Sequence, residues 1–570
     1  MLLSKFTDFN SDVARPDGYN SLEKMISWSR MGWRHVLFFA FIALSIGAVA
    51  GAQEAVNSVH NAVLQVRLAA DIFGDEKWVD LWAQGYSALV CVVPIVATGF
   101  AVHRFGRLPT ILVGLLLLCG SLCGSFLIEG SMIADDSDAA KAENITKAVW
   151  YAVSYGISSW WLIQSLLAIV YVFCYEVTPI KFRVPAVLGV FLMETLGSLA
   201  VGLARQYISN SVTVNDEEML AKYGETNFEE GKQYDLYFAQ IEALFKPISI
   251  VCWSLVVAAL IMGLAVIRRD TPAHLVNRGE TGLVYDRLVV DGTENSQERV
   301  PMTKEEFAVN AGRETDDALG FCAIVKRAVG PFAVIAQLLL SIAIMDRSVL
   351  TAYYYLVEET LSANGSSVVH DPIPGMLLRH GLSMVGVICA IGVWAWCKDI
   401  RFAPAAALVV SAIGSVICAS VQVFENDQLM NAKQVSSSMS IVVGVSVVYL
   451  ALPLLQALVR VLIMDMFTNK SRAVGVLALR AVEVAWIGIV NIASAELRAY
   501  SWFFVTVAVL VAVIGAVALG AFYCTKWFDH SLICRDPELD ACWLISEKTA
   551  EGQIIGSRDR LRPSLNGRSA

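Results

Sequence analysis

Twelve apolar stretches, each long enough to cross a lipid bilayer as a helix, constrain the fold of this chain more than any other feature. A hydrocarbon core of about 30 Å needs roughly 20 predominantly apolar residues per helix. The stretches are continuous and do not alternate with polar residues, which excludes the strands of a membrane β-barrel. They lie near residues 34–54, 80–102, 108–128, 149–174, 184–206, 247–267, 328–356, 375–397, 402–423, 436–463, 473–495 and 500–523. An all-α membrane protein with twelve transmembrane helices is therefore predicted.

Only 17% of the 570 residues are charged, whereas soluble proteins carry about 25%. Polar segments separate the apolar stretches into two groups of six. We predict a cytosolic N-terminal segment, an N-terminal six-helix bundle, a cytosolic linker that can contain short amphipathic helices, a C-terminal six-helix bundle and a cytosolic tail. Their respective bounds are 1–33, 34–267, 268–327, 328–523 and 524–570.

Basic residues gather in alternate connections, beginning with Arg104 and Arg107 after the second stretch. The connection 207–243, which lies on the other side, is acidic. Because Lys and Arg accumulate in cytoplasmic loops, both termini are predicted to be cytosolic. The glycosylation sequons that begin at Asn144 and Asn364 then fall on the opposite side, where modification can occur.

Ionisable residues avoid every third helix. The third, sixth, ninth and twelfth stretches have none between their ends, whereas other stretches carry Glu54, Asp80, Glu194, Asp346, Arg347, Arg460, Arg480 and Glu483. A charge that faces hydrocarbon is costly and is normally directed to a polar cavity or a partner. The four charge-free helices are therefore expected to face lipid, and the other eight to surround a polar interior.

A charged signature occurs once in each half, at the end of an apolar stretch. Glu176-Val-Thr-Pro-Ile-Lys-Phe-Arg183 and Asp465-Met-Phe-Thr-Asn-Lys-Ser-Arg472 both place an arginine seven residues after an acid. The recurrence of this signature at equal depth indicates a duplicated bundle. A duplicated membrane bundle makes transport the leading functional hypothesis.

Two kinds of loop resemble those of the major facilitator superfamily, particularly its sugar-porter and organic-ion-transporter branch. Gly99-Phe-Ala-Val-His-Arg-Phe-Gly-Arg107 is similar to the family's G-x-x-x-D-R-x-G-R, and Glu176–Arg183 is similar to its E-x-x-P-x-x-x-R. Looser copies follow in the second half at Lys398–Arg401 and Asp465–Arg472. The resemblance implies two pseudo-symmetric six-helix bundles and transport by alternating access.

Several residues depart from the family pattern. His103 replaces the aspartate of the first loop, Ile400 replaces the glycine of its repeat, and Thr468 replaces the proline of the second signature. The seventh helix lacks the glutamine-rich signature of sugar porters and carries Asp346 and Arg347 instead. These departures weaken the case for a hexose. They also leave open a transporter-like sensor or a non-transporting accessory subunit of a membrane assembly.

Residues at the predicted cytosolic helix ends are the candidates for a gate. Acid–guanidinium pairs that form across the two bundles would favour the state in which that side is closed. The alternative is that these residues only anchor the helix ends. The predicted gate comprises Gly99, Arg104, Gly106, Arg107, Glu176, Pro179, Arg183, Lys398, Arg401, Asp465 and Arg472.

Polar residues inside the helices are the candidates for solute binding and proton coupling. Arg480 and Glu483 are spaced i, i+3 and share a helix face. Glu194 lies near the middle of its helix, where a carboxyl group can carry a coupled proton. The alternative is an internal salt bridge, such as Glu483 with Arg347, that serves packing alone. The predicted site comprises Gln164, Glu194, Gln337, Asp346, Arg347, Tyr354, Arg480 and Glu483.

The residues thus predict a secondary transporter for a small polar organic solute, either a sugar or a charged or zwitterionic metabolite. Facilitated and proton-coupled transport are both compatible with the carboxylates. The sequence contains no nucleophile elbow, phosphate loop or metal cluster. We therefore expect no enzymatic activity, cofactor, metal or nucleic-acid partner, and we expect the partners to be the solute, the lipid bilayer and, in the coupled case, protons.

Overall fold

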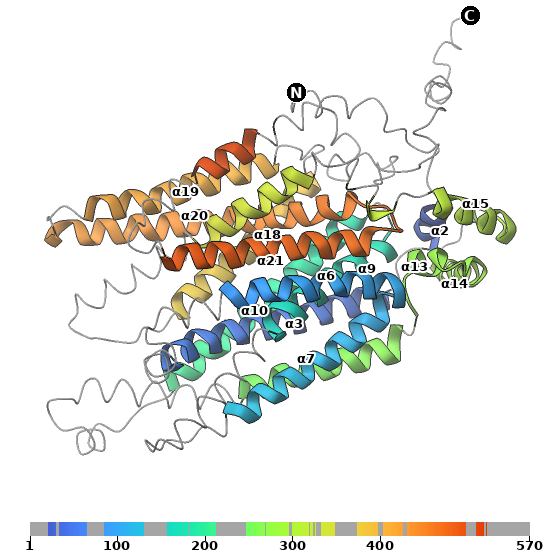
Figure 1. The fold of residues 1–570 in the computed structure, drawn as a ribbon, viewed down its shortest axis with the longest axis horizontal. Helices are drawn as coiled ribbons and strands as arrows, with labels where there is room; N and C mark the ends of the chain where they lie inside the picture. The colour runs from blue at the N-terminus through green and yellow to red at the C-terminus, as the bar shows by residue number, and fades with distance from the viewer. Residues whose placement is uncertain are drawn as a thin grey trace, which may run out of the picture.

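Long helices run side by side in the computed structural model (Figure 1). All regular secondary structure in the described residues is helical, in agreement with the predicted fold class. The structure describes residues 21–29, 33–64, 85–129, 157–179, 182–211, 247–267, 269–295, 299–317, 320–322, 325, 332–347, 373–396, 403–425, 430–496, 509–517 and 520.

The first half of the chain contributes helices to each of its six predicted stretches. They are α3 (Trp33–Leu64), α6 (Ser87–Phe105), α7 (Arg107–Glu129), the π-helical η4 (Ile157–Ile163) that continues into α9 (Gln164–Val177), α10 (Arg183–Ser211), and a helix over 247–262 that ends in the π-helical η6 (Gly263–Ile267). Gly106 separates α6 from α7 with a φ of 108°, a backbone conformation that favours glycine.

The second half repeats this pattern. Its helices are 332–347, α18 (Ile373–Trp396), α19 (Ala403–Glu425), α20 (Met430–Asp465), α21 (Arg472–Glu496) and 509–517. Among the described residues, seven helices are long and apolar enough to cross a membrane. The chain is therefore an integral membrane protein. The bounds of the two bundles stay a prediction.

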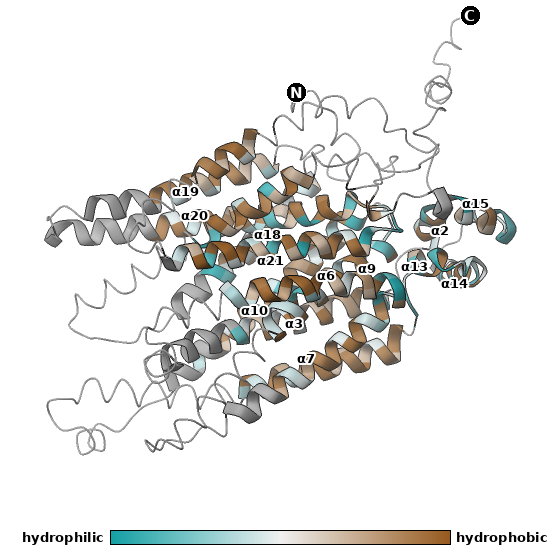
Figure 2. Cartoon of the chain, in the orientation of Figure 1, coloured by the Kyte–Doolittle hydropathy of each residue, from teal (hydrophilic) through white to brown (hydrophobic). Residues whose placement is uncertain are grey.

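The four helices predicted to face lipid carry apolar side chains on their outer surfaces. In Figure 1, α7 lies at one edge of the helix array and α19 at the opposite edge. Hydrophobic colouring covers both helices where they are described (Figure 2). The exposed apolar residues include Val113, Leu116 and Leu117 on α7, Ile250, Val251 and Ile261 on 247–267, Val409, Val410, Ile413 and Val416 on α19, and Leu510, Val513, Ile514 and Val517 on 509–517.

Helices α3 and α10 cross at glycines that allow direct backbone contact. A Cβ atom placed on Gly47 would lie 2.0 Å from the Glu194 carbonyl oxygen, and one on Gly197 would lie 2.2 Å from the Leu44 carbonyl oxygen. Small residues permit this kind of approach in membrane bundles. The Ser198 hydroxyl donates to the Gly47 carbonyl at 2.9 Å across the same contact. The crossing fixes the position of Glu194.

A small helical unit lies at one end of the array, at the right of Figure 1. It consists of α2 (Ser21–Ser29), α13 (Pro272–Asn277), α14 (Thr281–Asn295) and α15 (Lys304–Asp317). Trp28 lies directly on Gly292, where an added Cβ would approach its ring to 2.0 Å. The buried apolar core of the unit is Leu22, Met25, Ile26, Trp28, Ala273, Val276, Val284, Leu288, Phe307 and Ala311. Short helices in the linker were predicted, whereas the packing of α2 against them was not.

Candidate functional site

A polar cluster in the middle of the helix array joins the two halves of the chain. Glu194 on α10 accepts hydrogen bonds from the Tyr171 hydroxyl at 2.7 Å and from Arg460 Nη1 at 2.8 Å. Arg460 lies on α20, so this ion pair connects the first half to the second. The guanidinium also lies 4.0 Å from the Phe191 ring centroid and 4.9 Å from that of Tyr171, which stabilises its burial by cation–π contact.

A second pair on α21 extends the cluster. Arg480 forms an ion pair with Glu483 through Nη1, and its Nη2 donates to the Gln164 side-chain oxygen on α9. The Arg480 Nε is buried and has no hydrogen-bond partner among the described residues. Both guanidinium groups of the second half therefore reach acceptors on the first half.

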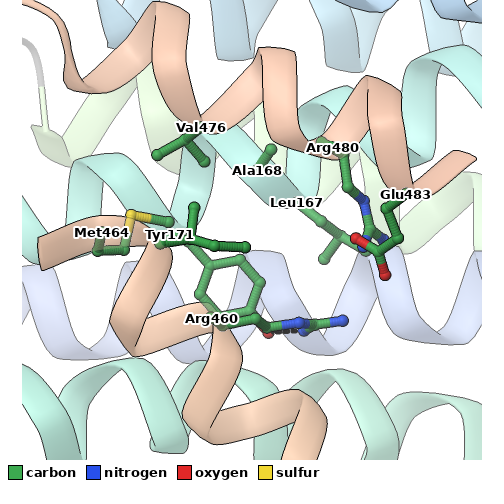
Figure 3. Close-up of a pocket in the computed structure, with 9 residues that line it drawn as sticks. Leu167, Ala168, Tyr171, Arg460, Met464, Val476, Arg480 and Glu483 are labelled. Carbon is green, nitrogen blue, oxygen red and sulfur yellow. Dashed lines mark hydrogen bonds and ion pairs between the residues drawn. The ribbon is translucent and has the colours of Figure 1, made fainter. Parts of the chain in front are cut away.

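Tyr171, Arg460, Arg480 and Glu483 of this cluster line a cavity of about 30 Å³, which is room for about one or two water molecules. Figure 3 shows Arg480 and Glu483 at the right, the Tyr171 ring at the centre with Arg460 beside it, and Met464 at the left. The lining residues are Leu167, Ala168, Tyr171, Arg460, Ile463, Met464, Val476, Arg480 and Glu483. The cavity combines two guanidinium groups with a mostly aliphatic wall.

The other predicted site residues lie outside this cavity lining. Asp346 pairs with Arg379 on α18 at 3.2 Å, whereas Arg347 donates from Nε to the Ser494 hydroxyl on α21 at 2.8 Å. The salt bridge considered between Glu483 and Arg347 is therefore wrong, because each residue has a nearer partner. Gln337 is half-buried on the helix 332–347, and Tyr354 lies outside the described residues.

A second buried cluster holds the predicted gate residues of the first half. The fully buried Arg107 donates from Nη2 to Glu176 at 2.7 Å, and its Nη1 lies 2.9 Å from His274 Nδ1. The Thr271 hydroxyl donates to the other oxygen of Glu176 at 2.6 Å. The Arg107–Glu176 pair thus lies within one half and is supported by α13, while the same carboxylate also forms a longer ion pair, at 4.0 Å, with Arg472 of the other half.

Asp270 connects the same cluster to the start of α7. Its carboxylate accepts hydrogen bonds from the backbone N–H of Arg107 at 2.8 Å and of Leu108 at 3.3 Å. An anion at a helix N-terminus satisfies free N–H groups and complements the helix dipole. Burial raises the pKa of Asp270, while the bonds from Thr271, Arg107 and Leu108 oppose that shift.

Contacts between the halves at this end of the molecule centre on Tyr175. The Tyr175 hydroxyl donates to Asp465 at 2.6 Å, and the Arg183 and Arg472 guanidinium groups each lie 4.5 Å from its ring centroid. Arg472 also approaches Glu176 to 4.0 Å. The arginines of the two repeated signatures therefore contact the same aromatic ring, that of Tyr175. Tyr175 was not among the predicted site residues.

The remaining gate predictions have separate positions. Arg183 pairs with Glu23 of α2, and Arg104 is exposed with its guanidinium 6.0 Å from the Phe105 ring centroid. Gly99 lies against Val474 and Leu477 of α21, and Pro179 is buried at the end of the Glu176 loop. Lys398 and Arg401, like the sequons at Asn144 and Asn364, lie outside the described residues. In the described ranges, no three His, Cys, Asp or Glu side chains form a metal-binding group.

Stability at this end should depend on pH through His274, which is only 1% exposed. Burial, reinforced by Arg107, lowers the pKa of His274 from 6.5 to about 4. The unfolded chain therefore takes up a proton that the folded protein excludes, and stability falls as pH decreases from 6.5 to 4. We expect a loss of about 1–3 kcal/mol over this window, measured by thermal unfolding of the purified protein.

The His274→Gln variant tests this assignment. Its amide oxygen can still accept a hydrogen bond from Arg107, but it does not titrate. The difference in unfolding temperature between pH 6.5 and pH 4 should therefore be smaller in His274→Gln than in the unmodified protein. An equal difference in the two proteins would contradict the role of His274.

Comparison with known proteins identifies the fold. No family model and no curated protein sequence matches the chain. The chain is similar to the major facilitator superfamily proton:xylose symporter XylE bound to 6-bromo-6-deoxy-D-glucose, with a TM-score of 0.56, 15% identity, and coverage of 86% of this chain and 95% of the other. A partially occluded inward-open xylose transporter XylE from E. coli gives a TM-score of 0.52 and 15% identity over 86% of this chain and 97% of the other. The major facilitator superfamily transporter FucP in the outward conformation gives a TM-score of 0.50 and 11% identity, with coverage of 87% of this chain and 99% of the other.

Long apolar helices around a polar centre are the arrangement of a polytopic membrane protein with a helical-bundle fold. Its fold is that of the major facilitator superfamily, and the resemblance first seen in the loops is confirmed at the level of the fold. At identities of 11–15%, the comparison establishes the fold alone and not the function.

Proposed function

We propose that this protein is a secondary transporter that moves a small polar organic solute across a membrane by alternating access. The observation that carries this proposal is the Glu194–Arg460 ion pair, whose two partners come from different halves of the chain. A solute that binds between the halves can replace one partner and release the other. The pair then links occupancy of the site to the relative position of the halves.

The contacts at Tyr175 support the same mechanism at one end of the pathway. Asp465 and Arg472 reach across to Tyr175 and Glu176, and the Asn277 side chain donates to the Asn469 carbonyl oxygen at 3.2 Å. We infer that these contacts close the transport pathway at this end. We assign this end and both termini to the cytosol, on the basis of its basic loops. The pathway can open at this end only when these contacts separate.

Two of the similar structures are described as proton symporters of xylose. These names support a small organic solute and a coupled proton, and they keep sugars among the substrates to be tested. Glu194 is our candidate for the coupling carboxylate, because it is the acid of the central cluster that pairs with an arginine of the other half.

The Glu194→Gln variant tests the proposed coupling. Purified protein in liposomes is supplied with radiolabelled D-xylose, L-fucose, glycine, pyruvate or choline, with and without an inward proton gradient. For the solute that the unmodified protein concentrates, we expect Glu194→Gln to lose gradient-driven accumulation and to retain exchange. The amide oxygen still accepts a hydrogen bond, but the amide cannot take up and release a proton. The exposed Lys304→Gln variant is the matched control. Unchanged pH dependence in Glu194→Gln would remove its role in coupling.

A non-transporting receptor or accessory subunit is the second candidate function. The small volume of the cavity favours it, because a carrier needs room for its solute in at least one state. Solute counterflow separates the two functions. A protein that binds a solute but exchanges none of it across the liposome membrane is a receptor.

A further inference from the structure

We propose that the solute is a small organic carboxylate, held by Arg480 and Arg460, whose charge is balanced by a proton on Glu194. This inference rests on the proposed transport function and specifies its substrate class. It is carried by three features of the central cluster: a donor without an acceptor, the balance of charge, and the shape of the cavity wall.

The free donor is the Nε of Arg480. Two other nitrogens of the same guanidinium are used, since Nη1 meets Glu483 and Nη2 meets Gln164. Nε is buried and has no acceptor among the described residues, and Arg480 is one of the residues that line the cavity. A buried donor of this kind is costly unless something satisfies it. A carboxylate oxygen is the acceptor that guanidinium groups bind most strongly.

The charges of the cluster are balanced before a solute binds. Arg460 and Arg480 carry two positive charges, and Glu194 and Glu483 carry two negative charges. An added carboxylate would leave one uncompensated negative charge in a buried site. A proton taken from the water on one side and carried by a carboxyl group restores the balance, and it is released to water on the other side.

Glu194 is the acid best placed to carry that proton. Its carboxylate accepts hydrogen bonds from Tyr171 of α9 and from Arg460 of α20, and its backbone packs against Gly47 of α3. The charged Arg379 of α18 is held by Asp346, and His380 of α18 is buried. The Arg480–Glu483 pair of α21 lines the same cavity as Arg460. Protonation of Glu194 weakens its bond to Arg460, which can then bind the solute carboxylate.

The cavity wall selects for a short apolar body behind the carboxylate. Leu167, Ala168 and Val476 line the cavity together with the two arginines (Figure 3). A sugar would need hydroxyl partners around the whole ring, and this wall offers few of them. The described conformation has room for only about one or two water molecules. Once the halves move apart, a carboxylate with a short aliphatic or keto chain can reach Arg480 and place its apolar part against this wall.

The first test compares pyruvate with its uncharged amide, pyruvamide, which has nearly the same shape. Thermal unfolding of the purified full-length protein is followed with each compound, and with D-xylose and choline. We expect stabilisation by pyruvate and at least about tenfold weaker apparent binding of pyruvamide, because the amide lacks the charge-assisted bond. Arg480→Gln should reduce pyruvate binding to the level of pyruvamide, whereas Lys304→Gln should not change it. Equal binding of pyruvate and pyruvamide overturns the proposal, whether or not Arg480→Gln folds.

The second test measures transport in liposomes that contain a pH-sensitive dye. An inward pyruvate gradient should acidify the lumen faster than in protein-free liposomes, and Glu194→Gln should abolish this acidification while pyruvate exchange continues. If D-xylose or choline is transported and pyruvate is not, the substrate class is wrong and the transport function stands. If none of these solutes, nor glycine or L-fucose, is exchanged, the transport function itself fails.

Discussion

Replacement of Arg107 by alanine is expected to lower the free energy of unfolding by about 3–5 kcal/mol, the cost of removing one partner of a buried ion pair. The Arg107 guanidinium is fully buried and contacts Glu176 at 2.7 Å and His274 at 2.9 Å. Its loss would leave the Glu176 carboxylate uncompensated. Arg472, at 4.0 Å, is too distant to replace the hydrogen bond.

Chemical unfolding of the purified protein in detergent measures this effect, and Arg104→Ala is the matched control. Arg104 belongs to the same loop but is exposed, so its replacement should change stability by less than about 0.5 kcal/mol. The double variant Arg107→Ala/Glu176→Ala should lose less than the sum of the two single changes, because no buried charge is then left alone. Equal losses in Arg104→Ala and Arg107→Ala would show that the loop, and not the ion pair, determines the effect.

Replacement of Gly197 by alanine is expected to destabilise the first half by about 1–3 kcal/mol through overpacking. The added methyl group would lie 2.2 Å from the Leu44 carbonyl oxygen and 2.6 Å from the Ala48 nitrogen. These are backbone atoms, so the methyl group can be accommodated only if α3 and α10 move apart. Because Glu194 is one turn away on the same helix, transport should fall together with stability.

Gly189→Ala is the control for this prediction. It changes the same type of residue in the same helix, but no atom lies within 4 Å of the added methyl group. Since glycine inside a helix costs about 0.5–1 kcal/mol relative to alanine, Gly189→Ala should leave stability unchanged or slightly increased. If Gly189→Ala and Gly197→Ala had the same effect, helix propensity and not the α3–α10 contact would be responsible.

The helices were predictable because hydrophobicity is a local property of the sequence. Each of the twelve stretches contains helix in the described residues, and the charge-free ones expose apolar side chains. The pairing of Arg480 with Glu483 follows from helical spacing alone, and the structure contains that pair.

The partners of the buried charges could not be predicted, because they come from distant parts of the chain. Asp270 and His274 are ordinary linker residues until α13 folds against the start of α7. Tyr171 and Tyr175 are two aromatic residues among many in apolar helices, and only the approach of Arg460 and Asp465 distinguishes them. A single sequence contains no signal for such contacts. The intramembrane position of Arg460 was visible, but nothing indicated Glu194 as its partner.

The contact between α2 and α14 has a consequence for how the chain is threaded through the bilayer. Trp28 precedes the first membrane helix, and Gly292 follows the sixth, yet the two residues lie against each other. Both must therefore be on the same side of the membrane, and the chain between them must cross it an even number of times. The contact therefore restricts membrane insertion, because an odd number of crossings between Trp28 and residue 272 would place Trp28 on the opposite side of the membrane from the helices that bury it.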